Sequence, residues 1–127
     1  RLQGDWSSDV CSSDLTLNDE TIPQLRCAIV AGAANNQLAD ETVHGRMLMD
    51  RGILYAPDFL INAGGVINCY REVHHLTEAE TKVLIENIYG RTLDIYKISR
   101  QQNIPTQQAA TQLAIERIEK AKSAKNN

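Results

Sequence analysis

Two short apolar runs with a helical segment between them limit the folds open to this chain more than any other feature. Residues 27–31 and 53–56 are apolar throughout rather than at alternate positions, which is typical of strands that helices cover on both faces of a parallel sheet. Residues 42–51 lie between these runs with the apolar period of a helix, and Gly52 follows at the position of a left-handed C-cap. The order of strand, helix and strand predicts an α/β fold with a doubly wound parallel sheet.

The segment after the second predicted strand carries two adjacent glycines. Pro57 stops the strand, and Asp58 can cap the helix that follows. Gly64 and Gly65 then stand in an otherwise apolar stretch of that helix, where each glycine costs about 1 kcal/mol relative to alanine. Such a pair indicates that a backbone or a ligand approaches the helix where a Cβ atom would collide. Packing of the helix on the sheet is the alternative explanation.

Sequence signals in the last third of the chain predict two helices. Residues 77–80 have the S/T-x-x-E form of a capping box, which opens a long helix that reaches about residue 100. Residues 103–105 break it, and a second helix starts at Thr106. Five residues are expected on the buried face of the second helix: Ala110, Leu113, Ala114, Ile118 and Ala121. The two helices predict a packed C-terminal hairpin, followed by a polar, frayed tail over residues 122–127.

Residues 1–14 differ in character from the rest of the chain. The tripeptide Ser-Ser-Asp occurs twice there, and no apolar period is present. We expect a prefix that is not native to the protein, such as a translated adapter sequence, with a genuine disordered tail as the alternative. The folded unit is expected to span residues 15–121.

Charge and cysteine spacing exclude several classes of protein. The net charge of −3 is spread along the chain, so no basic stripe predicts nucleic-acid binding, and no apolar run approaches the roughly 18 residues of a membrane span. The cysteines are Cys11, Cys27 and Cys69, and their wide spacing argues against a metal site or a disulfide framework and fits a reducing cytoplasm. Surface or capping positions, rather than ligand positions, are expected for His44, His74 and His75.

Three stretches resemble one enzyme family. Residues 57–68, PDFLINAGGVIN, resemble the stretch that the glutamate, leucine, phenylalanine and valine dehydrogenases place beside the substrate. Residues 32–38 look like the cofactor-contacting turn of that family, and residues 18–25 look like the segment that leads into it in the leucine branch. The resemblance implies part of a Rossmann-type cofactor domain followed by the helical hairpin. It also implies NAD-dependent oxidative deamination of an L-amino acid to a 2-oxo acid and ammonia.

The resemblance assigns site residues in two groups. Ala34 and Asn35 are expected to bind the cofactor, because Asn35 aligns with the asparagine that in the family reaches the nicotinamide ribose and the substrate amino group. An asparagine that only caps the following helix is the alternative. The substrate pocket is expected to be lined by Asn62, Gly65, Val66 and Cys69. Asn62 could instead satisfy buried backbone groups.

Cys69 bears on the choice of substrate. Val66 and Cys69 are three residues apart and so share a helix face. Leucine-type enzymes carry an aliphatic residue at the Cys69 position and glutamate-type enzymes a serine, and a thiol behaves as a small hydrophobe. The sequence therefore favours a branched-chain substrate such as L-leucine, with a glutamate-type enzyme as the alternative.

No catalytic residue is expected within these 127 residues. The reaction needs a lysine of shifted pKa, and no lysine here stands in an apolar setting. The phosphate-binding pattern G-x-G-x-x-G does not occur either. The resemblance implies that both lie in preceding parts of a full-length homo-oligomer, so this chain by itself could be a non-catalytic nucleotide-binding or helix-pairing piece. The sequence does not distinguish NAD from NADP.

Overall fold

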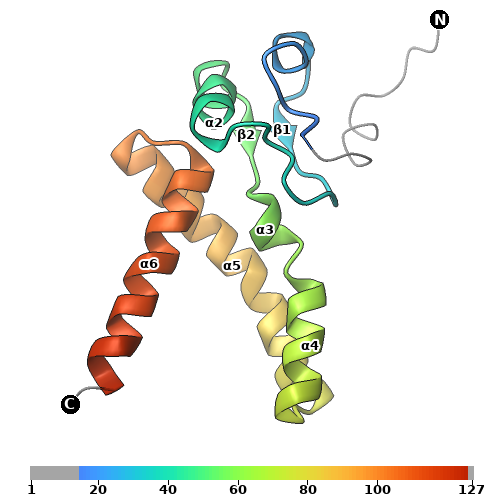
Figure 1. Ribbon diagram of the computed structural model, residues 1–127, viewed down its shortest axis with the longest axis vertical. Helices are drawn as coiled ribbons and strands as arrows, with labels where there is room; N and C mark the ends of the chain where they lie inside the picture. Colours follow the sequence, from blue (N-terminus) through green and yellow to red (C-terminus); the bar gives the residue numbers. More distant parts are fainter. Residues whose placement is uncertain (1–14, 126–127) are drawn as a thin grey trace, which may run out of the picture.

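The computed structural model describes residues 15–125. Figure 1 shows a head that contains both strands and α2, from which two helical legs extend. One leg consists of α4 beside the first part of α5, and the other is α6. The predicted prefix, residues 1–14, lies outside the described residues.

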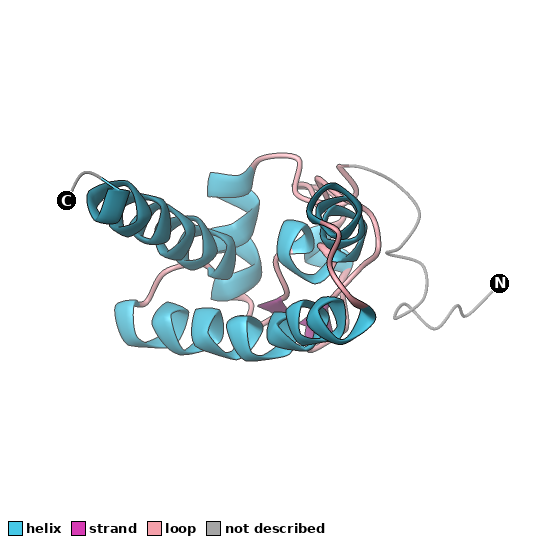
Figure 2. Cartoon of the chain, turned by 90° about the horizontal axis from the view of Figure 1, so that it is seen from below, coloured by secondary structure: helices cyan, strands magenta, loops and turns pink. Residues whose placement is uncertain are grey.

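The head contains a parallel pair of strands. β1 (Ile29–Val30) pairs with β2 (Leu54–Tyr55), with Ile29 opposite Leu54 and Val30 opposite Tyr55. The connection between them runs through α2 (Glu41–Asp50), as parallel strands require a crossover. The parallel pairing predicted from the two apolar runs is confirmed. The sheet is nevertheless small beside the helices, as Figure 2 shows.

Only one face of β1 is covered. Val30 is buried, whereas Ile29 is 59% exposed, because neighbouring side chains of a strand point to opposite faces. The prediction that helices cover both faces of the first strand is therefore wrong for the part of the chain that the structure describes. The covered face belongs to a core whose buried members are Leu17, Ile22, Leu25, Val30, Leu38, Leu48, Ile53 and Tyr55. Ile22 belongs to the short 3-10 helix η1 (Ile22–Gln24).

Helix α2 ends as the sequence predicts, and its first turn is capped by a residue that was not predicted. Asp40 is the N-cap, and its Oδ1 accepts hydrogen bonds from the backbone N–H groups of Thr42 and Val43, both at 2.8 Å. Gly52 adopts a φ of 70°, the left-handed conformation predicted for it. His44 is buried rather than at the surface, and its Nδ1 accepts the backbone N–H of Asp40 at 2.8 Å.

Gly45 allows α6 to approach α2. A Cβ atom at Gly45 would overlap the side-chain amide of Gln107, which is buried and whose Nε2 donates to the carbonyl oxygen of Glu41. Gly45→Ala displaces the buried amide from its partner, which costs roughly 1–3 kcal/mol. The gain in helix propensity of about 1 kcal/mol offsets part of this cost, so the free energy of unfolding is expected to fall by up to about 2 kcal/mol. Urea unfolding followed by circular dichroism measures the change.

The control for Gly45 is a double substitution. With Gln107→Ala in place, the added methyl group has room, so Gly45→Ala should then cost much less than it does alone. An equal cost in both backgrounds would show that contact with Gln107 does not explain the glycine.

Two helices, rather than one, follow the second strand. α3 (Asp58–Ile61) ends at Asn62, and α4 (Gly64–His74) starts after Ala63. The expectation that Asp58 caps the helix with the two glycines is wrong, because Pro57 is the N-cap and Asp58 lies in the first turn of α3. The glycines begin α4 instead, and a Cβ atom on either would meet open space. Neither packing on the sheet nor a close backbone contact among residues 15–125 therefore explains them.

The capping box at the start of α5 (Glu78–Gln102) is confirmed. The Thr77 hydroxyl accepts the backbone N–H of Glu80 at 3.3 Å, and the Glu80 carboxylate accepts the backbone N–H of Thr77 at 2.8 Å. The hydrogen bond from the Thr77 backbone to the Glu80 carboxylate lowers the pKa of Glu80, and so does the one that the Thr77 hydroxyl donates to the same carboxylate at 2.7 Å. At its other end α5 stops at Asn103, which has a φ of 54°, as the predicted break requires.

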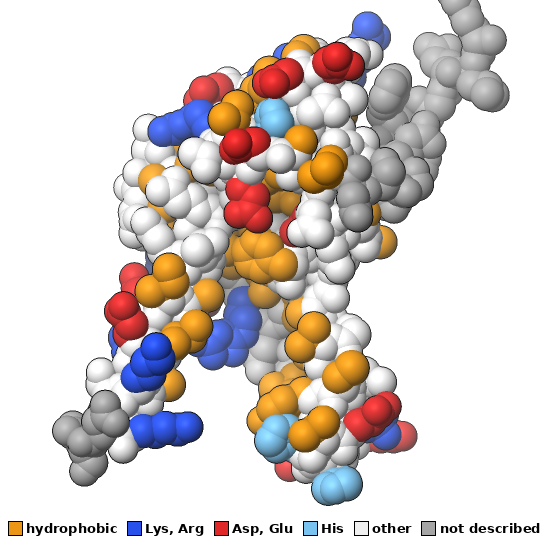
Figure 3. Space-filling view, in the orientation of Figure 1, with side chains coloured by type: hydrophobic (Ala, Val, Ile, Leu, Met, Phe, Trp, Pro, Cys, Tyr) orange, Lys and Arg blue, Asp and Glu red, His pale blue; other side chains and the backbone are white. Residues whose placement is uncertain are grey.

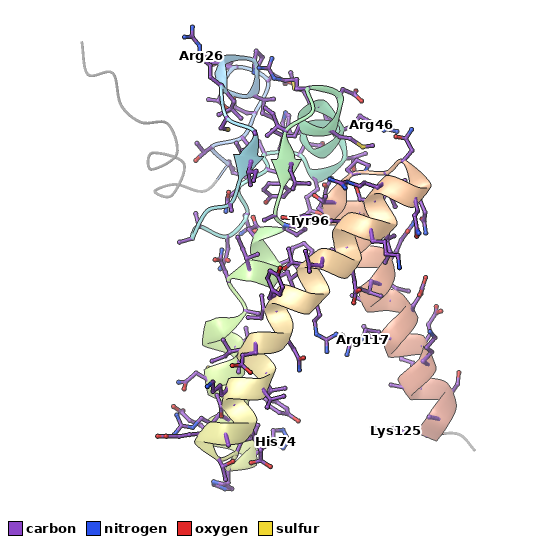
Figure 4. The ribbon with its side chains drawn as sticks, turned by 180° about the vertical axis from the view of Figure 1, so that it is seen from behind. Arg26, Arg46, His74, Tyr96, Arg117 and Lys125 are labelled. Atoms are coloured by element: carbon purple, nitrogen blue, oxygen red, sulfur yellow. The ribbon has the colours of Figure 1, made fainter. Side chains whose placement is uncertain are left out.

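Helix α6 (Thr106–Lys125) contacts α5 only near their connection. The second core contains Ile95 of α5 with Ala109 and Ala110 of α6. Beyond it the helices diverge (Figure 1), and His74 of α4 and Lys125 of α6 lie at the far ends of the two legs (Figure 4). The helix continues through Lys125, so the predicted tail is helical as far as that residue.

The buried face predicted for α6 is mostly wrong. Ala110 is buried and Leu113 is partly buried, but residues 114–125 are exposed, and Ile118 is 54% exposed. The first turn of α6 is attached to the head, where the Thr106 hydroxyl donates to the carbonyl oxygen of Tyr55 at 2.7 Å. Beyond this turn α6 diverges from α5, so the expected face of the hairpin has no partner in the described part of the chain.

Helix α4 buries none of its residues. Its most exposed apolar side chains are Val66 and Val73, at 73% and 74%, and Figure 3 shows hydrophobic side chains gathered over this leg. Neither α4 nor any other helix described between residues 15 and 125 is long and apolar enough to cross a membrane.

Candidate functional site

The two residues assigned to the cofactor lie in the turn that follows β1. This turn, residues 32–37, lies beyond the carboxyl end of the strand, where open α/β sheets bind their ligands. Ala34 is half-buried and Asn35 is exposed. Asp40 rather than Asn35 caps α2, so the alternative of a purely capping role for Asn35 is wrong.

Asn62, from the end of α3, reaches across to this turn. Its Nδ2 lies 3.1 Å from the carbonyl oxygen of Gly32, 3.2 Å from that of Ala34 and 3.3 Å from Oδ1 of Asn35. The structure thus brings together three of the predicted site residues, Ala34, Asn35 and Asn62. The Asn62 amide nitrogen satisfies backbone carbonyls, which leaves only its oxygen for a substrate.

Gln37 holds the same turn from within. Its side chain is fully buried, and its Nε2 donates to the carbonyl oxygens of Gly32 at 2.9 Å and Ala34 at 2.7 Å. A Cβ atom on residue 32 would lie 2.9 Å from the Gln37 amide, which explains the glycine there. Gln37 was not among the residues predicted for the site, because no local sequence pattern shows that a glutamine in a turn is buried.

Asp58 completes the arrangement from the start of α3. Its carboxylate is buried and accepts the backbone N–H groups of Gln37 at 2.8 Å and Phe59 at 2.6 Å. Burial raises the pKa of Tyr55 well above its ordinary value, and the charge and hydrogen bonding of Asp58 raise it further. Tyr55 therefore stays protonated beside the carboxylate. We call Gly32, Ala34, Asn35, Gln37, Asp58 and Asn62 the turn cluster.

The other predicted pocket residues are not part of the turn cluster. Gly65, Val66 and Cys69 lie on α4, and all three are exposed. The spacing of Val66 and Cys69 places them on one face of that helix. A cavity of about 230 Å³ between α2, β2 and α5 contains none of the predicted site residues in its lining, which includes Met49, Tyr55, Ser99 and Arg100.

The chemistry of the turn cluster is that of amides. Among residues 15–125, histidine, cysteine and acidic side chains form no group of three or more that could hold a metal ion. The Asn35 oxygen faces the Asn62 amide nitrogen, and an amide also carries two N–H donors. With its side chain exposed at the end of β1, Asn35 can donate to the hydroxyl or carbonyl groups of a ligand.

Comparison with known proteins identifies one family. A sequence model described as Glutamate/Leucine/Phenylalanine/Valine dehydrogenase matches residues 11–126. A leucine dehydrogenase from Thermoactinomyces intermedius is 46% identical over 109 residues, which are 86% of this chain and 30% of that protein. An L-tryptophan dehydrogenase from Nostoc punctiforme is 45% identical over 116 residues, which are 91% of this chain and 33% of that protein.

Solved structures agree with the sequence comparison. The crystal structure of the Nostoc punctiforme L-tryptophan dehydrogenase superposes with a TM-score of 0.84 and covers 89% of this chain and 34% of that one. A glutamate dehydrogenase from Peptoniphilus asaccharolyticus, 24% identical, superposes with a TM-score of 0.70 over 91% of this chain and 30% of that one, and shows the shared fold. The chain thus spans about a third of the length of the curated relatives it matches.

Proposed function

This chain belongs to the glutamate/leucine/phenylalanine/valine dehydrogenase family, and from that premise we propose that it forms the C-terminal part of an NAD-dependent L-amino-acid dehydrogenase. When bound, NAD would accept the hydride that leaves the Cα atom of the substrate, and water would convert the resulting iminium into a 2-oxo acid and ammonia. A Rossmann-type cofactor domain, a cytoplasmic location and a homo-oligomeric assembly belong to the same proposal. The parallel strands with their crossover helix support the first of these.

The position of Asn35 is the observation that carries this proposal. The residue stands just past the end of β1, with its side chain exposed and its oxygen held by Asn62. We assign to Asn35 the contact with the nicotinamide ribose and the substrate amino group, and to Ala34 a backbone contact with the cofactor. A fixed amide there orients the substrate without exchanging a proton.

The substrate proposed is an amino acid with an apolar side chain, with L-leucine first. Cys69 and Val66 offer no charge to a substrate carboxylate, and the Thermoactinomyces relative is named for leucine. L-Tryptophan is the second candidate, because the Nostoc relative is similar to nearly the same degree. A glutamate-type enzyme receives less support, since the glutamate dehydrogenase structure shows the fold alone.

Asn35→Ala tests the proposal in a restored enzyme. We define this enzyme as residues 15–125 placed in the matching segment of the Thermoactinomyces intermedius leucine dehydrogenase. The substitution is expected to lower kcat/KM for L-leucine roughly tenfold to a thousandfold, the range for one or two hydrogen bonds made near the transition state. Steady-state formation of NADH measures the effect.

The matched control is Asn87→Ala, which removes an exposed amide from the middle of α5. It should leave kcat/KM unchanged, and both variants should melt within a few degrees of the unsubstituted enzyme because neither residue is buried. Unchanged kinetics in Asn35→Ala would remove Asn35 from the site.

A further inference from the structure

Residues at the two ends of helix α3 both bind the turn of residues 32–37. Asp58 in the first turn of the helix binds the backbone of Gln37, and Asn62 just past its end binds the carbonyls of Gly32 and Ala34. We propose that Asp58 and Gln37 are positioning residues, which fix this turn and thereby the reactive orientation of Asn35. The inference rests on the proposed function, since it concerns the same site.

Two amides share the same pair of carbonyl oxygens. Gln37 Nε2 lies 2.9 Å and 2.7 Å from the oxygens of Gly32 and Ala34, and Asn62 Nδ2 lies 3.1 Å and 3.2 Å from them. Each carbonyl oxygen accepts two hydrogen bonds. The two hydrogens of Gln37 Nε2 serve this pair, whereas those of Asn62 Nδ2 are shared among the same two oxygens and Oδ1 of Asn35. The peptide units 32–33 and 34–35 are therefore held from two directions, so the turn cannot rotate without breaking these hydrogen bonds.

Asp58 fixes the far side of the turn. Its carboxylate is 7% exposed, and it accepts N–H groups from Gln37 and Phe59 beside the protonated Tyr55. A buried carboxylate is stable only while these partners stay in place. Release of the Gln37 backbone would leave the charge unsatisfied, so the carboxylate resists movement of the segment that follows Asn35.

Both residues are shielded from solvent, unlike Asn35. The Gln37 side chain is 0% exposed and Asp58 is 7% exposed, whereas Asn35 is exposed. Any effect of these two residues on the reaction must pass through the turn. Their contribution should therefore disappear once the Asn35 side chain is removed, which is a result that a general loss of stability would not produce.

A double-mutant cycle in the restored enzyme tests this dependence. Gln37→Met keeps the length of the side chain but removes both N–H donors, and Asp58→Asn removes the charge with almost no change in shape. Each is expected to lower kcat for L-leucine roughly tenfold to a hundredfold, with a smaller change in KM. In the Asn35→Ala background the same substitutions should lower kcat less than about twofold.

Additional measurements separate the outcomes. The kinetic isotope effect with substrate deuterated at Cα should increase in both variants, because a misplaced Asn35 slows the hydride step. Equal losses of kcat with and without the Asn35 side chain would overturn the proposal. An inactive restored enzyme before any substitution would instead contradict the proposed function. Should Gln37→Met not fold, as judged by its melting temperature, Asp58→Asn carries the test alone, because it leaves the Gln37 side chain in place.

Discussion

Purified by itself, this 127-residue chain is expected to form no measurable NADH from L-leucine. The chain spans about a third of the length of its curated relatives, and the family resemblance implies that the reacting lysine and the phosphate-binding loop lie in the remainder. The turn cluster supplies amides, backbone carbonyls and one buried carboxylate. Amides and carbonyl oxygens are too weakly basic to activate water, and the buried Asp58 carboxylate is already occupied by the backbone N–H groups of Gln37 and Phe59. The expected loss exceeds that of any single substitution, because several catalytic groups are missing together.

The measurement compares equal concentrations of the isolated chain and of the restored enzyme. A tagged chain produced in a host without amino-acid dehydrogenase activity avoids contamination. NADH formation by the isolated chain, proportional to its concentration and lost with Asn35→Ala, would contradict the expectation. It would also show that residues 15–125 contain a base that neither the sequence nor the structure indicates.

The restored enzyme is expected to prefer L-leucine, L-valine and L-isoleucine to L-glutamate by a large factor. If Val66 and Cys69 face the substrate, the pocket wall is apolar, and a carboxylate buried against it loses hydration without gaining a partner. That penalty amounts to several kcal/mol, so the ratio of kcat/KM values should be on the order of a hundredfold or more. Differences of one methylene among the aliphatic substrates should be worth only about 1–3 kcal/mol.

Substitutions at Cys69 isolate the contribution of this chain to the preference. Cys69→Ser should weaken the aliphatic substrates modestly without making the enzyme specific for glutamate, because a hydroxyl supplies no positive charge. Cys69→Leu should alter the ranking among aliphatic substrates by its size. The Cys69 side chain is exposed on α4, as is that of Val66. Neither Cys69 substitution should therefore disturb the folding of residues 15–125.

A second chimaera shows which part of the enzyme sets the preference. It joins residues 15–125 to the remainder of the Nostoc punctiforme L-tryptophan dehydrogenase, and L-tryptophan and L-phenylalanine are added to the substrates. Preference for L-glutamate in either chimaera would overturn the pocket assignment. A preference for L-tryptophan that persists in both would favour the second candidate, and indifference to every Cys69 substitution would show that this residue does not face the substrate.

Local signals in the sequence predicted most of the helix ends. The capping box at Thr77, the left-handed Gly52 and the break at residues 103–105 all appear in the structure. Each depends on hydrogen bonds or backbone angles within a few residues, so neighbouring sequence is sufficient to specify them. The two apolar runs likewise predicted the parallel pairing of β1 and β2. The residues of the three stretches that resemble the dehydrogenases predicted the family.

The contacts between distant segments were decided by the tertiary structure alone. The helix predicted after Pro57 is interrupted at Asn62, whose amide is bound to carbonyls about thirty residues earlier in the chain. The first turn of α6 is attached to Tyr55, about fifty residues earlier in the chain, and α6 then diverges from α5. Gln37 and Asp58 are buried because α3 lies against the turn after β1. A polar side chain can be buried only where another segment supplies its hydrogen-bond partner. The sequence around a residue shows that the residue is polar, but it does not show which distant segment will lie beside it.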